Sequence, residues 1–190
     1  MTDSTPRPRT PLDRNDWIQA AYEVLADKGV EGLRVEVLAK AFGVTKGSFY
    51  WHFKDRQDLL SAVLELWRDG RIRDIDKQTH AGPGSERDKL THLIELYSAN
   101  RNRRGIAIEL AVRDWARRDL EAARTVDDVD SHRLECTCRL FIAVGLSDEE
   151  AKARSLLLYA YVFDQSLVSY EHFDAQMPAL KHWIAKHITC

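Results

Sequence analysis

Hydrophobic residues between Leu33 and Asp58 fall into two short helical patterns separated by one glycine. The first pattern places apolar side chains three or four residues apart, in a stripe of Val35, Leu38, Ala39 and Phe42. The second, from about Lys46 to Phe53, offers two core anchors four residues apart, Phe49 and Phe53. The spacing therefore predicts a second helix that packs through two phenylalanines and presents its remaining side chains to a partner.

The junction between the two patterns has the residues of a tight turn between helices. Gly43 stands where a left-handed C-cap is needed, because a residue without a side chain adopts positive φ at no steric cost. The hydroxyl of Thr45 is placed to accept from the backbone N–H groups of a helix that begins at Lys46 or Gly47. A helix-turn-helix motif has this layout. The junction predicts a DNA reader whose second helix enters the major groove.

The second helix carries the residue types that a recognition helix needs. Lys46, Gly47 and Ser48 lie at its N-terminus, the part that reaches base edges and phosphates. Three flat side chains with polar tips follow, Tyr50, Trp51 and His52. The alternative is that the aromatic cluster is core and that the lysines are ordinary solvated charges. Three consecutive helical residues cannot all face inward, which favours a surface position for part of the cluster.

The segment Leu38–Leu60 resembles the tetracycline-repressor (TetR) family of transcriptional regulators, through the run Leu-Ala-Lys-Ala-Phe-Gly-Val-Thr-Lys-Gly-Ser-Phe-Tyr-Trp-His-Phe-Lys-Asp-Arg-Gln-Asp-Leu-Leu. The preceding helix, predicted over Trp17–Gly29 with the exit Gly29-Val-Glu-Gly-Leu33, is similar to the same family. The resemblance implies a DNA face formed by Thr45, Lys46, Gly47, Ser48, Tyr50, Trp51 and His52, with Lys54 meeting phosphate from the start of the next helix. Arg34 stands where relatives commonly have a small hydroxyl residue, and an arginine suits a phosphate contact better than a cap.

Every pattern downstream of the motif is helical. A connecting helix over Asp55–Gln78, interrupted by Gly70, ends before the breaker cluster Ala81–Ser85. Ser85 is placed to cap a helix with the stripe Leu90, Leu93, Ile94 and Tyr97, and the polar run Asn100–Gly105 predicts a loop. Further helices are predicted over Ile106–Arg118, Leu120–Val144, Asp148–Glu171 and Ala175–Ile188. The chain is therefore predicted to be all-α, with about nine helices.

The chain divides into three predicted units: a flexible arm over residues 1–12, a helix-turn-helix DNA-binding domain of three helices over residues 13–60, and a larger effector-binding and dimerisation domain over residues 61–190. The arm holds Arg7 and Arg9 among prolines, and it either reaches a minor groove or is disordered. It has no apolar pattern that would fold it.

The helix over Asp148–Glu171 has more apolar surface than one chain of this size needs to bury, which predicts a homodimer. Two half-sites on DNA also call for a two-fold assembly and a palindromic operator. The TetR resemblance implies a four-helix interface built from Leu120–Val144 and Asp148–Glu171. The alternative is that these helices only close the core of one subunit.

The TetR resemblance further implies a small-molecule effector that binds the C-terminal domain and shifts the spacing of the two DNA readers. Large aromatic residues with a few polar groups are typical of such sites. The candidate lining residues are Trp67, Tyr97, Leu110, Arg113, Asp114, Trp115, Tyr159 and Phe163. The alternative is that each of them is an ordinary core residue. The sequence of the C-terminal domain has no signature that identifies the effector.

Composition narrows the class of protein further. The chain has 190 residues, 44% of them hydrophobic, and a formal net charge of −2, so DNA affinity must come from local positive charge rather than a global field. A membrane-spanning run and a signal-peptide core are both missing from the sequence, which predicts a cytoplasmic protein. His132 and Cys136 lie four residues apart and could share a metal, but two ligands do not close a site. We therefore expect no metal and no cofactor.

The leading hypothesis is a dimeric, sequence-specific transcriptional repressor that a small molecule releases from its operator. The alternatives are a DNA-binding regulator that needs no ligand and a helical module that binds protein through its aromatic face. An enzyme is disfavoured, because the sequence has no Gly-rich phosphate loop, no Gly-x-Ser-x-Gly elbow and no metal-ligand set. A salt titration with duplex DNA separates these classes, since affinity for phosphates falls steeply as salt rises.

Overall fold

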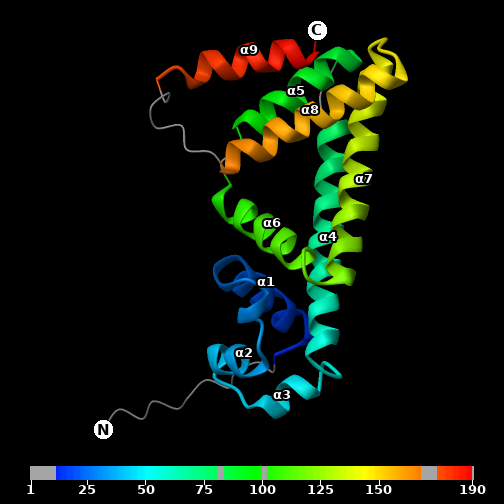
Figure 1. Cartoon of the computed structure of the whole chain (residues 1–190). Coiled ribbons are helices and arrows are strands. Elements are labelled where there is room, and N and C mark those ends of the chain that lie inside the picture. Colours follow the sequence, from blue (N-terminus) through cyan, green and yellow to red (C-terminus); the bar gives the residue numbers. More distant parts are fainter. Residues whose placement is uncertain (1–11, 81–83, 100–101, 168–174, 190) are drawn as a thin grey trace.

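The computed structural model describes residues 12–80, 84–99, 102–167 and 175–189, and all regular structure within them is helical (Figure 1). The predicted arm, apart from its last residue Leu12, therefore lies outside the described residues. The elements are α1 (Arg14–Lys28), η1 (Val30–Gly32), α2 (Val35–Phe42), α3 (Lys46–Tyr50), α4 (Arg56–His80), α5 (Glu86–Ala99), α6 (Arg103–Ala116), α7 (Leu120–Ala143), α8 (Asp148–Leu167) and α9 (Met177–Thr189). The prediction of an all-α chain is confirmed.

The first three helices form a compact unit around aromatic side chains. Asp13 opens α1 with a capping box, in which its side chain accepts from the backbone of Asp16 at 2.9 Å. Trp17 is fully buried and contacts Phe42 and Phe49 edge to face, at centroid distances of 5.1 and 5.5 Å. These contacts fix α1 across α2 and α3, so the position of the turn between them is set by the core.

Helix α4 joins the N-terminal unit to the rest of the molecule (Figure 1). It runs without a break over 25 residues, so the predicted interruption at Gly70 is wrong. A single glycine costs roughly 1 kcal/mol in a helix, which burial along the remainder of the helix outweighs. Its buried face, which includes Leu59, Val63 and Trp67, packs against α7 along much of its length. One rigid element therefore connects the two halves.

Two hydrophobic clusters stabilise the described chain. The larger begins at Trp17, follows α4 and extends to residues of α6 and α7 such as Val112 and Val129. The smaller joins α5, α7, α8 and α9 at the opposite end of the molecule, through Leu90, Leu93, Ile94, Leu140, Phe141, Ala151, Leu158 and Ile188. Because the larger cluster crosses the predicted boundary at residue 60, the N-terminal unit and the connecting helix share one core.

Most predicted helices are found, and the differences lie at their ends. Helix α6 begins at Arg103 instead of Ile106, because the side chain of Asn102 caps it by accepting from Gly105 N–H at 3.0 Å. The predicted Asn100–Gly105 loop is therefore too long. Ser85 caps α5 as predicted, since its hydroxyl accepts from Asp88 N–H at 3.3 Å. Gly145 takes positive φ between α7 and α8, and Ser147 caps α8.

Candidate nucleic-acid interface and effector cluster

The turn between α2 and α3 has the geometry that the sequence predicts, apart from one cap. Gly43 has φ 66° and ψ 35°, the left-handed conformation that a glycine adopts without strain. Thr45 occupies the N-cap position of α3 with extended backbone, but its hydroxyl makes no capping hydrogen bond. The predicted hydroxyl cap is therefore wrong, and the hydroxyl is exposed on the surface. A polar group at this point is available to a ligand.

Helix α3 is shorter than predicted, and this sets the positions of the aromatic residues. It ends at Tyr50 instead of Phe53, so Trp51 and His52 lie in the turn that follows. Phe49 and Phe53 are buried, at 0% and 2% exposure, and their rings stack at 5.1 Å. Tyr50 and Trp51 are exposed at 60% and 88%. The core and surface aromatics thus divide as the helical spacing indicates.

Positive charge around α3 is partly neutralised by neighbouring carboxylates. Lys46 Nζ contacts Glu36 Oε1 of α2 at 2.6 Å, and this hydrogen bond lowers the pKa of the Glu36 carboxyl. The pair is exposed, so DNA phosphate can compete for the lysine. Arg34 and Lys54 are also exposed. Gly47 and Ser48 lie in the first turn of α3. The predicted DNA residues therefore lie on or near one solvent-facing turn and short helix.

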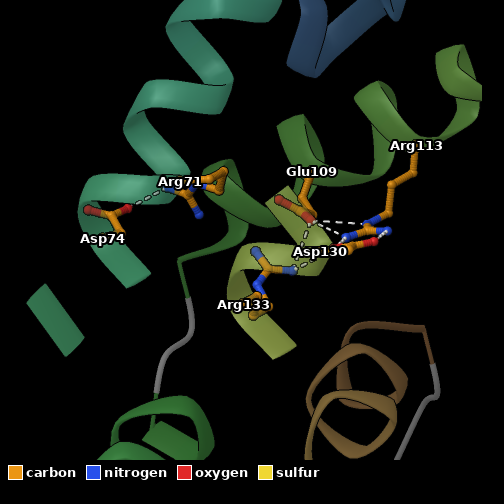
Figure 2. Close-up of polar contacts among 6 residues, drawn as sticks. All are labelled: Arg71, Asp74, Glu109, Arg113, Asp130 and Arg133. Atoms are coloured by element: carbon orange, nitrogen blue, oxygen red, sulfur yellow. Dashed lines mark hydrogen bonds and ion pairs between the residues drawn. The ribbon is translucent and has the colours of Figure 1, made fainter. Parts of the chain in front are cut away.

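A second candidate site lies where α6, α7 and α8 meet, at a cluster of buried and partly buried charges (Figure 2). Arg113 of α6 donates to Glu109 at 2.8 Å and to both oxygens of Asp130 on α7, at 2.7 and 2.8 Å. Arg133 of α7 lies 3.3 Å from Asp130 and 3.7 Å from Glu109. Two arginines and two carboxylates balance in formal charge, which makes their burial tolerable. These four residues are called the charge cluster below.

The charge cluster keeps polar atoms that the described chain does not satisfy. Within the described residues, Glu109 Oε2 and Arg133 Nε are buried without a hydrogen-bond partner, and each side chain belongs to a residue only 7% exposed. Arg71 Nε on α4 is also buried without a hydrogen-bond partner in the described residues, although a terminal nitrogen of the same guanidinium donates to Asp74 at 2.7 Å (Figure 2). An unsatisfied buried donor or acceptor costs about 1–3 kcal/mol, so a partner that supplied the missing hydrogen bonds would be stabilised there.

Aromatic rings of α8 cover the two arginines of the charge cluster. The guanidinium of Arg113 lies 4.3 Å from the Phe163 centroid, and that of Arg133 lies 5.2 Å from it and 5.4 Å from the Tyr159 centroid. Burial alone would lower the pKa of Arg113, but hydrogen bonds and charge from Asp130 and Glu109 outweigh it and raise the pKa. Arg113 thus stays ionised, beside flat apolar surface.

The structure brings together only some of the predicted effector residues. Arg113, Tyr159 and Phe163 meet at the charge cluster. Trp67 and Trp115 instead belong to the larger hydrophobic core, and Leu110 is half-buried. Asp114 is exposed and pairs with Arg118 at 3.3 Å. The side chain of Tyr97 lies outside the described residues. The sequence reasoning missed Glu109, Asp130 and Arg133. Charged pairs three or four residues apart within largely apolar helices were the available signal.

Helix α6 is also tied directly to the N-terminal unit. Arg104 donates to Glu23 Oε2 at 2.7 Å, to the Glu23 carbonyl at 2.6 Å, and to Asp27. These acceptors all belong to α1, which also packs against α6. Helix α6 is therefore held directly to the helix that packs across the turn between α2 and α3.

Comparison with known proteins agrees with this architecture. Residues 18–63 match the model of "Bacterial regulatory proteins, tetR family". The chain is 33% identical over 96 residues to the HTH-type transcriptional regulator AcrR of Shigella flexneri, covering 48% of this chain and 44% of that protein. It is 34% identical over 108 residues to the class A tetracycline repressor protein from transposon 1721 of Escherichia coli, covering 57% of this chain and 45% of the repressor. The chain thus spans less than half the length of these curated relatives.

The fold as a whole also matches solved structures. A transcriptional regulator from Rhodococcus sp. Rha1 superimposes with a TM-score of 0.72 at 21% identity, covering 93% of this chain and 94% of the other. An all-helical molecule with an N-terminal helix-turn-helix is the class that these observations define. Residues 18–63 therefore match the TetR family, and the chain as a whole shares the fold of the solved regulator. No helix in the part of the chain described by the structure is long and apolar enough to cross a membrane.

Proposed function

We propose that this protein is a sequence-specific DNA-binding regulator that contacts the major groove through α3 and the turn after it. The observation that carries the proposal is the exposure of Tyr50 and Trp51 beside the buried Phe49 and Phe53. Two adjacent large aromatic side chains, 60% and 88% exposed, form an apolar patch of the kind that marks an interaction site. Arg34, Lys46 and Lys54 supply positive charge around them. The match of residues 18–63 to the TetR family supports the same reading.

We also propose a homodimer, because two-fold symmetry presents two readers to successive turns of DNA. The sequence suggested α7 and α8 as the interface helices. The fold supports α8 and α9 better, because α7 is packed against α4, α6 and α8. Large exposed hydrophobic residues lie on α8 and α9, at Leu156, Leu157, Leu180 and Trp183, although Ile142 of α7 is also exposed. A second copy of the chain would cover them.

The charge cluster is the proposed anchor for a small-molecule effector that releases the protein from DNA. A ligand group with a donor for Glu109 Oε2 and an acceptor for Arg133 Nε would complete the buried hydrogen bonds. Because the cluster is already balanced in charge, a neutral polar group such as an amide or hydroxyl fits better than an ion. Arg104 gives α6 a direct connection to α1, through which binding would bias the DNA-binding unit.

Selection from a random duplex library, followed by fluorescence anisotropy with the selected sequence, tests the DNA-binding proposal. The logarithm of the affinity should fall linearly with the logarithm of salt concentration, with a slope set by the number of phosphates neutralised. Trp51→Ala should lose affinity while keeping the thermal unfolding of the parent. A chain that enriches no duplex sequence, and captures none at low salt, is not a DNA reader.

A further inference from the structure

Helices α4 and α7 bring three metal-ligating side chains together at one point of their contact. Asp76 comes from the C-terminal part of α4, and His132 and Cys136 come from successive turns of α7. Each of the three side chains offers one ligand atom, and these three atoms all lie within 4.8 Å of one another. In the sequence only His132 and Cys136 are neighbours, and two ligands do not make a site. The fold supplies the third.

We propose that Asp76, His132 and Cys136 bind one divalent metal ion of the zinc type. A thiolate and an imidazole select such borderline ions over Mg²⁺ or Ca²⁺, which prefer all-oxygen sites. Three protein ligands with a solvent molecule in the fourth position form a common open tetrahedral arrangement. Binding through sulfur replaces the thiol proton with the metal and releases that proton to solvent.

The distances suit a tetrahedral ion after one small movement. Zinc–nitrogen and zinc–sulfur bond lengths imply a separation of about 3.6 Å between the two ligand atoms at a tetrahedral angle. The observed distance between His132 Nε2 and Cys136 Sγ is 3.6 Å. Asp76 Oδ1 lies closer, 2.7 Å from the same nitrogen, where the two groups share a hydrogen bond. The Asp76 side chain is 49% exposed, so it can withdraw by several tenths of an ångström to admit the ion.

Burial and access at this point also suit a metal. Cys136 is 3% exposed and belongs to the larger hydrophobic core, whereas the side chains of His132 and Asp76 are 29% and 49% exposed. The sulfur is therefore shielded, and the carboxylate leaves a path for the ion and for the fourth ligand. Arg139 donates to Cys136 Sγ at 2.9 Å, and the same hydrogen bond would stabilise a thiolate bound to metal.

The position of the site gives it a regulatory consequence, which rests on the proposed function. An ion held by Asp76 on one side and by His132 and Cys136 on the other would join α4 to α7. Helix α4 leads directly to the DNA-binding unit (Figure 1). If the ion prefers one arrangement of these helices, it changes DNA affinity by that preference, and DNA changes metal affinity by the same factor.

A cobalt titration of the untagged full-length chain under reducing conditions tests the site itself. Co²⁺ should bind at one ion per chain with a thiolate-to-cobalt charge-transfer band, and Zn²⁺ should displace it and abolish the band. Cys136→Ser should remove the band, and His132→Gln and Asp76→Asn should each weaken Co²⁺ binding by about tenfold or more. Cys138→Ser is the matched control, a half-buried cysteine two residues away that should leave the titration unchanged. Far-UV circular dichroism confirms that each variant is folded.

A wild-type chain without the charge-transfer band, or a band that survives in Cys136→Ser and is lost in Cys138→Ser, would overturn the proposed site. DNA affinity measured with and without Zn²⁺ tests the regulatory part separately. A zinc-dependent change in the wild type that Cys136→Ser abolishes supports it, and equal affinities with zinc bound overturn it. If the chain binds Co²⁺ through Cys136 but enriches no duplex, the metal site stands and the DNA-binding proposal fails.

Discussion

Two adjacent residues of α3 show how finely the role of a side chain depends on its helical position. Phe49 is fully buried against Trp17, and Tyr50 is 60% exposed beside it, with the two rings in an edge contact at 5.2 Å. Their hydrophobicity is similar, so composition does not separate them. The difference follows from the turn of about 100° between successive helical residues. Substitution of Tyr50 should therefore affect ligand binding, and substitution of Phe49 should affect the stability of the fold.

Tyr50→Ala and Lys54→Ala should each weaken binding to the selected duplex by about tenfold, the loss of one charge-assisted hydrogen bond to phosphate. Both residues are exposed, so the unfolding midpoint should stay near that of the parent. Fluorescence anisotropy and denaturant unfolding measure the two effects. Lys152→Ala, an exposed lysine on α8, is the matched control and should leave DNA affinity unchanged. In contrast, Phe49→Ala should destabilise the fold by about 3–5 kcal/mol.

Glu36→Gln should strengthen DNA binding at low salt. The substitution removes a negative charge beside the proposed DNA face and frees Lys46 from its 2.6 Å contact. Anisotropy at low and high ionic strength should show the gain shrinking as salt screens the charge. Glu149→Gln, an exposed carboxylate at the start of α8, is the control. Unchanged affinity at low salt would mean that Lys46 and Glu36 lie away from the phosphates.

At the scale of elements, α4 shows how a strong local signal is overridden by packing. Gly70 favours an end or a kink in isolation, yet α4 continues through it for ten more residues to His80. Buried residues on both sides of it, Trp67 and Ile75, hold the helix against its neighbours. The glycine therefore has no conformational task there, and a residue with a side chain should be tolerated.

Gly70→Ala should stabilise the protein by roughly 0.5–1 kcal/mol, because alanine has the higher helix propensity. Among described atoms, nothing outside the local helix backbone lies within 4 Å of the added Cβ. Urea unfolding at a fixed protein concentration measures the change. Gly32→Ala is the contrasting variant, since its Cβ would collide with Lys28 Cβ and should cost about 1–3 kcal/mol. A destabilised Gly70→Ala variant would mean that α4 needs flexibility at this point.

At the scale of the whole molecule, the arrangement of helices decides which apolar surface remains for a partner subunit. Helix α7 is long and amphipathic, but its neighbours cover residues such as Val129, Thr137 and Phe141. Helices α8 and α9 lie at the end of the molecule remote from α3 (Figure 1). They meet where Arg154 donates to the Ile188 carbonyl at 2.9 Å. A dimer formed there would leave both DNA-binding units accessible.

Leu157→Lys and Trp183→Lys should each convert the proposed dimer to a monomer, because a charge would be buried in the interface. Sedimentation velocity over a range of concentrations measures the change. Leu120→Lys is the matched control, since Leu120 is 67% exposed on α7 and lies outside the proposed interface. Dissociation by Ile142→Lys but not by Trp183→Lys would favour the interface of α7 and α8 instead. A monomeric parent would contradict both.

The sequence by itself determined the parts of this protein that depend on local geometry. Gly43 at the turn, Phe49 and Phe53 in the core and Ser147 at the start of α8 follow from backbone conformation and helical periodicity within a few residues. The resemblance to the TetR family is recognisable for the same reason, because the helix-turn-helix is one short contiguous segment. Periodicity states which face of a helix is apolar, but it does not name the helix that covers that face.

Only the tertiary structure decided which distant residues meet. Asp76 and His132 are separated by 56 positions, and Arg113 and Asp130 by 17, and neither pair shares a local pattern. The burial of Glu109 and Arg133 likewise depends on how α6 and α7 are rotated against each other. A charged residue on a helix is ordinarily read as solvent-exposed, because isolated burial of a charge is costly. The residues that pair with such a buried charge come from other helices, so its role is decided only when the helices pack together.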